Sequence, residues 1–122
     1  MCPRILVADD DRALQVLLKV ILSRAGFEVD FASNGRDALQ KALEDSYDAI
    51  MLDLIFPDFS GIEILDRIER KKPGSMKKVI VLTGASRGVV DRVDVSRVYA
   101  VLRKPFDIHD VIRLTTECAH EA

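Results

Sequence analysis

The chain has 122 residues, of which 48% are hydrophobic and 31% charged, and its formal net charge is −2. This length suits one domain with its own hydrophobic core, so we expect a single domain over residues 1–122. The balanced charge gives no reason to expect direct binding to nucleic acid or to an anionic membrane. No apolar run approaches the roughly 18 residues that a membrane-spanning helix needs.

The two cysteines, Cys2 and Cys118, lie at opposite ends of the chain. We interpret them as free thiols in a reducing compartment. The first apolar run is short and ends in aspartates, unlike a signal peptide, so the cytoplasm is the expected location. His109 and His120 lack the spacing of a metal-binding pair.

The first half of the chain alternates between apolar runs of strand length and helical patterns. Residues 4–8 are expected to form a buried strand, because they are apolar after the first position. Residues 12–25 place their leucines on one helical face, and Gly26 ends that pattern. A second strand over 28–31 ends at an Asn-Gly turn signal, and a helix follows over 36–43.

The second half repeats this alternation. A third strand over 49–52 is apolar throughout, as expected for a central parallel strand covered on both faces. Ser60 and Glu63 have the spacing of a capping box at the start of a third helix, which ends before Pro73-Gly74. Two more strands are expected over 78–82 and 100–102, and Asp107 and Asp110 mark the start of a final helix.

Residues 89–98 are ambiguous, because their valines suit either a helix or a strand. If this segment is counted as a helix, five strands alternate with five helices. That alternation predicts an α/β fold with a doubly wound, five-stranded parallel sheet. The flavodoxin-like strand order 2-1-3-4-5 is the expected topology.

Polar side chains follow four of the five predicted strands, at the carboxyl ends where open parallel sheets bind ligands. These are Asp9 and Asp10, Asp53, Thr83 and Lys104. The first and third strands are neighbours in this topology, so their carboxylates should meet. Each such pair would repel by roughly 4 kcal/mol at about 4 Å and an effective dielectric near 20. Oxygen ligands of this kind favour Mg²⁺ over Zn²⁺.

These groups together are typical of phosphoryl chemistry. A metal ion and the Lys104 ammonium can neutralise phosphate oxygens, and the Thr83 hydroxyl can donate a hydrogen bond. Asp53 is the expected nucleophile, because Asp9 and Asp10 are better placed as metal ligands. Asp11 is interpreted as the N-cap of the following helix.

At this point the chain resembles, over essentially its whole length, the receiver domains of response regulators in two-component signalling. Five segments carry the resemblance in the family's order. They are ILVADDD (5–11), ASNGRDAL (32–39), YDAIMLDLIFPDFSGIEIL (47–65), VIVLTGAS (79–86) and VLRKPFD (101–107).

The resemblance implies that Asp53 accepts a phosphoryl group from a sensor histidine kinase or a histidine phosphotransfer protein. It implies Mg²⁺ held by Asp10 directly, by Asp9 mainly through water, and by Asp53 and the backbone carbonyl of Ile55. Thr83 and Lys104 would bind the phosphoryl oxygens. Such a domain phosphorylates and dephosphorylates itself without being a conventional enzyme, and we expect a monomer or weak homodimer.

Two departures from the family pattern concern the surface that partners recognise. An aromatic switch residue usually stands three positions before the lysine, where this chain has Val101. Tyr99 would face the same way if strand alternation extended to it, so it is a candidate substitute. The family's Gly-Ala step before the fifth strand is replaced by Ser96-Arg97-Val98. Ile55 and Ala85 occupy positions that tune water access to the phosphoaspartate in this family.

Several alternatives remain open. The chain is either a stand-alone regulator, which we favour because no linker follows the last predicted helix, or the N-terminal receiver of a longer one. A receiver-like binding module that works without phosphorylation is the alternative function. A phosphatase of the dehalogenase type would need a carboxylate where Ile55 stands. A nucleotide- or flavin-binding domain would need a glycine-rich loop after the first strand.

Overall fold

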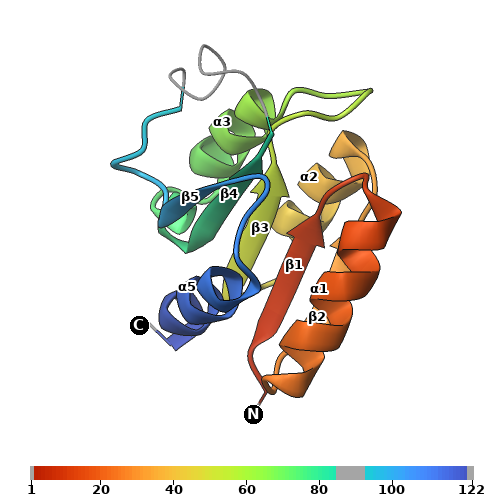
Figure 1. Cartoon of the computed structure of the whole chain (residues 1–122). Coiled ribbons are helices and arrows are strands. Elements are labelled where there is room, and N and C mark those ends of the chain that lie inside the picture. Colours follow the sequence, from red (N-terminus) through yellow and green to blue (C-terminus); the bar gives the residue numbers. More distant parts are fainter. Residues whose placement is uncertain (1, 85–92, 121–122) are drawn as a thin grey trace.

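The computed structural model describes residues 2–84 and 93–120. Its centre is a five-stranded parallel sheet with the strand order β2-β1-β3-β4-β5 (Figure 1). The predicted fold class and topology are therefore confirmed. The strands are β1 (Arg4–Ala8), β2 (Glu28–Ala32), β3 (Ala49–Asp53), β4 (Val79–Thr83) and β5 (Ala100–Arg103).

Four α-helices and one short 3₁₀ helix are found in the described ranges. They are α1 (Arg12–Arg24), α2 (Gly35–Glu44), α3 (Gly61–Lys71), η1 (Ser75–Lys78) and α5 (Ile108–His120). Most bounds lie within one residue of the sequence prediction. Lys78 belongs to η1 instead of the fourth strand. The helix considered over 89–98 falls mainly on residues 85–92, which lie outside the described ranges, and residues 93–98 form bends and turns.

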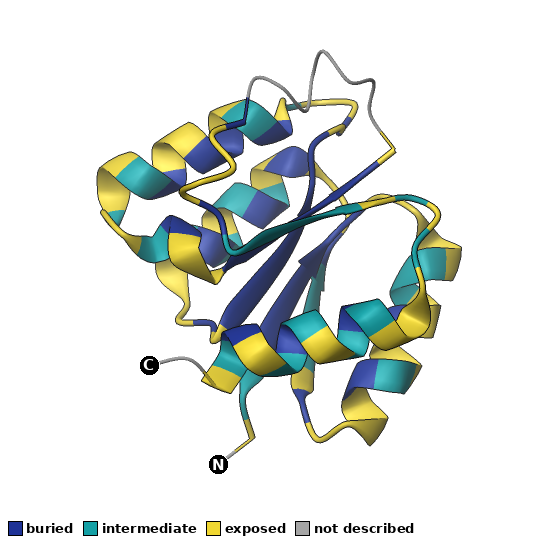
Figure 2. Cartoon of the chain, turned by 60° about the vertical axis from the view of Figure 1, so that its left-hand side comes forward, coloured by how far each residue is buried: buried dark blue, intermediate teal, exposed yellow. Residues whose placement is uncertain are grey.

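The sheet separates two hydrophobic clusters. One cluster joins the sheet to α2 and α3, and the other joins it to α1 and α5. Figure 2 shows the central strands buried and the edge strand β5 only partly covered. Burial on both faces is why β3 and β4 are apolar along almost their whole length. In α1, Leu18 and Leu22 supply the fully buried contacts to the sheet.

The caps of α1 and α3 follow the sequence prediction in part. Asp11 caps α1 by accepting a hydrogen bond from the backbone amide of Leu14 at 3.2 Å, as predicted. Ser60 caps α3, but its hydroxyl accepts from the amide of Ile62 and not from that of Glu63. The Glu63 carboxylate instead pairs with Arg67, one helical turn on, so the expected capping box is not formed.

The expectation that Tyr99 faces the same side of the sheet as Val101 is wrong. Val101 packs against the cluster on the α2 and α3 side, whereas Tyr99 packs against the cluster on the α1 and α5 side. The Tyr99 hydroxyl donates to the Glu117 carboxylate of α5 at 3.4 Å. Tyr99 lies in a bend before β5, so the alternation of strand side chains does not extend to it.

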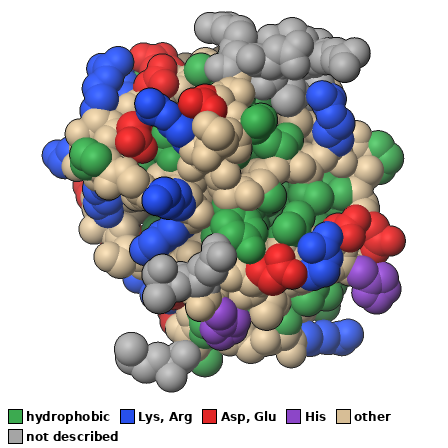
Figure 3. All heavy atoms as spheres, turned by 90° about the vertical axis from the view of Figure 1, so that its left-hand side faces the viewer, with side chains coloured by type: hydrophobic (Ala, Val, Ile, Leu, Met, Phe, Trp, Pro, Cys, Tyr) green, Lys and Arg blue, Asp and Glu red, His purple; other side chains and the backbone are tan. Residues whose placement is uncertain are grey.

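On the face that carries the β5 edge, hydrophobic side chains are exposed between charged ones (Figure 3). Cys2 is exposed, Cys118 is buried, and both are free thiols, as expected. Within residues 2–84 and 93–120, no helix combines the length and hydropathy needed to cross a bilayer.

Candidate functional site

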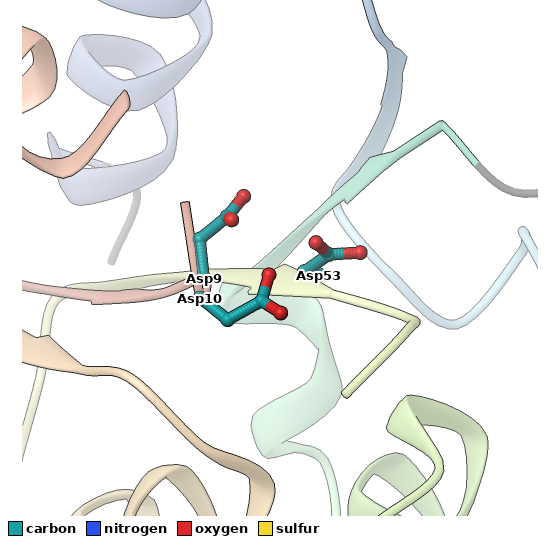
Figure 4. Close-up of side chains that lie close together, drawn as sticks. All are labelled: Asp9, Asp10 and Asp53. Carbon is teal, nitrogen blue, oxygen red and sulfur yellow. The ribbon is translucent and has the colours of Figure 1, made fainter. Parts of the chain in front are cut away.

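Three carboxylates meet at the carboxyl edge of the sheet. Asp9 and Asp10 directly follow β1, and Asp53 is the last residue of β3. The parallel register pairs Ala8 with Leu52, which brings the two strand ends side by side. One oxygen from each carboxylate lies within 4.8 Å of the others. Figure 4 shows the three side chains at the ends of their strands. Asp9 and Asp53 are buried, whereas Asp10 is exposed to solvent.

Lys104 bridges the two buried carboxylates. Its Nζ lies 2.7 Å from Oδ2 of Asp9 and 3.2 Å from Oδ2 of Asp53. The Lys104 backbone amide donates to the Thr83 carbonyl at 2.7 Å, which fixes the lysine beside the end of β4. The following peptide bond, Lys104-Pro105, is cis. Lys104, the last of the predicted site residues along the chain, therefore lies between the two buried carboxylates of the site.

Thr83 is the buried last residue of β4, the neighbour of β3. The structure thus places all of the predicted side chains, Asp9, Asp10, Asp53, Thr83 and Lys104, at one edge of the sheet. Ile55 lies just beyond β3, and its backbone amide donates to Oδ1 of Asp53 at 3.0 Å. Val101 lies within β5 and faces the other side of the strand from Leu102.

Gln15 of α1 is a site neighbour that sequence reasoning missed. Its side-chain amide donates to the backbone carbonyl of Asp9 and, at 3.0 Å, to the hydroxyl of Ser33. The amide therefore ties the β1–α1 turn to the end of β2. The position of Gln15 in the predicted helix did not indicate these contacts, because they depend on how α1 packs against the sheet.

The charges of the site perturb two of its groups. Burial raises the pKa of Asp53, and the negative charge of Asp9 raises it further. The Ile55 amide and Lys104 oppose this rise without cancelling it. For Lys104, burial lowers the pKa, but the hydrogen bonds and charges of Asp9 and Asp53 outweigh burial and leave the pKa raised. The Asp9 charge thus adds to the effect of burial at Asp53, and the two carboxylates stabilise the charged form of Lys104.

In the absence of Mg²⁺, Asp53→Asn is expected to raise the free energy of unfolding by about 1 kcal/mol. The substitution removes a buried negative charge beside Asp9 but keeps an oxygen that can accept from the Ile55 amide. Urea unfolding with EDTA checks this. Asp48→Asn, at the opposite end of β3, gives the control for the charge change alone.

The pH dependence of this difference has a defined sign. The folded-state pKa of Asp53 is raised, so the folded chain binds the proton more tightly than the unfolded chain. Stability from Asp53 is therefore fully present below its ordinary pKa of 3.8 and is lost as pH rises through the folded-state pKa. The advantage of Asp53→Asn should accordingly grow with pH above about 4. An advantage that shrinks toward neutral pH would contradict the repulsion.

The donor set fits a hard divalent cation. All three clustered side chains offer carboxylate oxygens, the ligands that Mg²⁺ prefers, and within residues 2–84 and 93–120 no sulfur or imidazole ligand joins them. In the described part of the chain, Lys104 is the basic side chain paired with this cluster, so three carboxylates share one ammonium. The remaining negative charge favours a cation at this edge.

Comparison with known proteins decides the family. A sequence model of the response regulator receiver domain matches residues 5–116, which is nearly the whole chain. The chain belongs to this family. The acidic cluster, Thr83 and Lys104 of this receiver domain are the residues that carried the resemblance in the sequence.

Curated relatives of the receiver domain are transcriptional regulatory proteins. ResD of Bacillus subtilis is 44% identical over 69 residues, which cover 57% of this chain and 29% of ResD. SrrA of Staphylococcus aureus (strain COL) is 37% identical over 83 residues, which cover 68% of this chain and 33% of SrrA. The receiver domain thus spans about a third of the length of these relatives.

Solved structures show the same fold over nearly the full chain. A CheY-like receiver domain protein from Methanospirillum hungatei JF-1 superposes with a TM-score of 0.87 at 28% identity, covering 98% of this chain and 94% of that one. The response regulator TrrA from Thermotoga maritima, in complex with Mg²⁺-BeF, gives a TM-score of 0.82 at 31% identity. That match covers 95% of this chain and 98% of TrrA.

Proposed function

We propose that this receiver domain accepts a phosphoryl group on Asp53 from a phosphohistidine of a sensor histidine kinase or a histidine phosphotransfer protein. The observation that carries the proposal is the arrangement around Asp53. Its carboxylate sits at a strand end, in contact with the Lys104 ammonium and beside two further carboxylates that can hold a metal ion. This combination supports the proposal, because phosphoryl transfer needs a nucleophile, a cation beside it and a site for a metal ion.

In the proposed reaction, a carboxylate oxygen of Asp53 attacks phosphorus and forms a P–O bond. The P–N bond to the donor histidine breaks, and its electron pair stays on the imidazole nitrogen. Lys104 would bind an oxygen of the transferred group, and the Thr83 hydroxyl would donate to another. Hydrolysis would reverse the modification when water attacks the same phosphorus, which breaks the P–O bond to Asp53, frees its carboxylate and releases inorganic phosphate.

Asp9, Asp10, Asp53 and the backbone carbonyl of Ile55 would hold the metal ion, and the all-oxygen donor set favours Mg²⁺. When bound, Mg²⁺ would neutralise charge on the phosphoryl oxygens. The Mg²⁺-BeF complex of TrrA, a relative of the same fold, supports this choice of ion. The negative charge shared by the three carboxylates supports it independently.

The proposed output is a change in a surface that partner proteins recognise. Movement of Thr83 toward a bound phosphoryl group would bias this surface between two states. Val101 takes the place of the usual aromatic switch, so we propose that the β5 face responds through packing of Val101 against Val81, its partner in β4. The downstream partner is proposed to be a protein, without direct contact between this domain and nucleic acid.

The test is intact mass after incubation with acetyl phosphate and Mg²⁺. We expect one phosphoryl group on the wild type and on the Asp48→Asn control, but none on Asp53→Asn. EDTA should prevent the gain. A gain that survives Asp53→Asn would assign the acceptor elsewhere. No gain in any variant, even with a phosphorylated histidine phosphotransfer protein as donor, would favour the phosphorylation-independent binding module.

A further inference from the structure

The loop between β3 and α3, residues 54–60, forms the wall of the site next to Asp53. Its neck is closed by the Gly61 amide, which donates to the Leu54 carbonyl at 2.9 Å, and by an antiparallel bridge between Ile55 and Ser60. The Ile55 amide at this neck donates to Asp53. The position of the loop therefore decides where the backbone of Ile55 lies relative to the phosphoacceptor.

The tip of this loop is tied to a different helix. The Asp58 carboxylate spans the first turn of α2: its Oδ1 accepts from the Gly35 amide at 2.8 Å, and its Oδ2 accepts from the Arg36 amide at 3.2 Å. The first amides of a helix have no partner within the helix, and a negative charge there is favourable. These two bonds lower the pKa of Asp58, as expected for a carboxylate held in its charged form.

The first turn of α2 is shaped to receive the loop. A Cβ atom added at Gly35 would lie 2.3 Å from Cβ of Phe59 and 3.1 Å from Oδ1 of Asp58, so only glycine permits this approach. The Arg67 guanidinium covers the Phe59 ring from α3, 5.2 Å from its centroid. Asn34 caps the same helix through the Asp37 amide at 2.8 Å, a different amide from the two that Asp58 binds.

We propose that Asp58 is a positioning residue for the phosphoacceptor site. By holding the loop tip on the first turn of α2, its carboxylate fixes the backbone of Ile55 against Asp53 and aims the Ile55 carbonyl at the metal site. The metal part of this inference rests on the function proposed above. The Ile55–Asp53 contact is a feature of the chain itself and can be followed without any ligand.

Amide hydrogen exchange and Mg²⁺ titration of the wild type and four variants test this inference. In Asp58→Ala we expect the Ile55 amide to exchange about tenfold faster, and the Kd for Mg²⁺ to rise about 3- to 10-fold, as when outer-shell support of a metal site is lost. Asp58→Asn keeps an oxygen that can accept one of the two bonds, so both effects should be smaller. Asn34→Ala is the matched control, because it removes a cap from the same helix but leaves the loop in place.

Different outcomes separate positioning from simple helix capping. If Asn34→Ala changes the Ile55 exchange and the Kd for Mg²⁺ as much as Asp58→Ala does, the effect is loss of α2 stability and the inference is wrong. Unchanged values in Asp58→Ala would also overturn it. Gly35→Ala pushes the loop from the other side and should reproduce the Asp58→Ala result.

Failure of the proposed function would look different. If the wild type accepts no phosphoryl group, the role of Asp58 is still tested by comparing the Ile55 amide exchange and the Mg²⁺ affinity of the wild type with those of the variants. If the wild type binds no Mg²⁺ either, the exchange of the Ile55 amide decides it alone. Loss of phosphorylation with unchanged exchange in Asp58→Ala would count against positioning.

Discussion

Lys104→Met is expected to strengthen Mg²⁺ binding about tenfold and to slow phosphoryl transfer to Asp53 about a hundredfold. The two effects have opposite signs because Lys104 does two things. Without a metal ion, its ammonium occupies Oδ2 of both Asp9 and Asp53, so a cation must compete with it. During transfer, the same ammonium would balance charge on a phosphoryl oxygen, and methionine cannot.

Titration calorimetry with Mg²⁺ and the rate of mass gain with acetyl phosphate at saturating Mg²⁺ check the two effects. Lys77→Met makes the same change at an exposed position in η1, before the amino end of β4, and should alter neither value. A Kd for Mg²⁺ that is unchanged or raised in Lys104→Met would show that the lysine does not compete with the ion. An unchanged rate of mass gain in Lys104→Met would show that Lys104 takes no part in phosphoryl transfer.

Gly61→Ala is expected to lower the free energy of unfolding by about 3 kcal/mol. Helix propensity alone predicts the opposite sign, because alanine is favoured over glycine in a helix and Gly61 begins α3. The structure decides otherwise. A Cβ atom at Gly61 would lie 2.4 Å from Cα of Leu54 and 2.7 Å from the carbonyl oxygen of Asp53, and backbone atoms cannot yield as a flexible side chain can.

Urea unfolding of Gly61→Ala beside Gly26→Ala separates crowding from backbone strain. Gly26 has a φ of 97° and open space around its Cβ position, so alanine there should cost only about 1 kcal/mol. Because one of the crowded atoms is the carbonyl oxygen of Asp53, the proposed phosphoacceptor, Gly61→Ala should also slow phosphorylation, while Gly26→Ala should not. A stabilised Gly61→Ala protein would mean that the end of β3 relaxes freely.

The local pattern of the chain was enough to predict most of the architecture. Contiguous apolar residues predicted β1, β3 and β4, because strands covered on both faces need apolar side chains on both. The strand order then placed Asp9 and Asp53 on neighbouring strands. The site residues were predictable for the same reason, since the ends of parallel strands meet at one edge whatever the loops do.

Contacts between distant segments were not predictable. Which oxygens Lys104 binds, the reach of Gln15 to the Asp9 carbonyl and the hold of Asp58 on α2 depend on how helices and loops pack against the sheet. Tyr99 was assigned to the wrong side because strand alternation does not continue through the bend before β5. The sequence by itself therefore determined the sheet and the chemical groups at its edge. The tertiary structure decided their partners, because hydrogen bonds between distant segments are set by register and packing and leave no periodic signal in the chain.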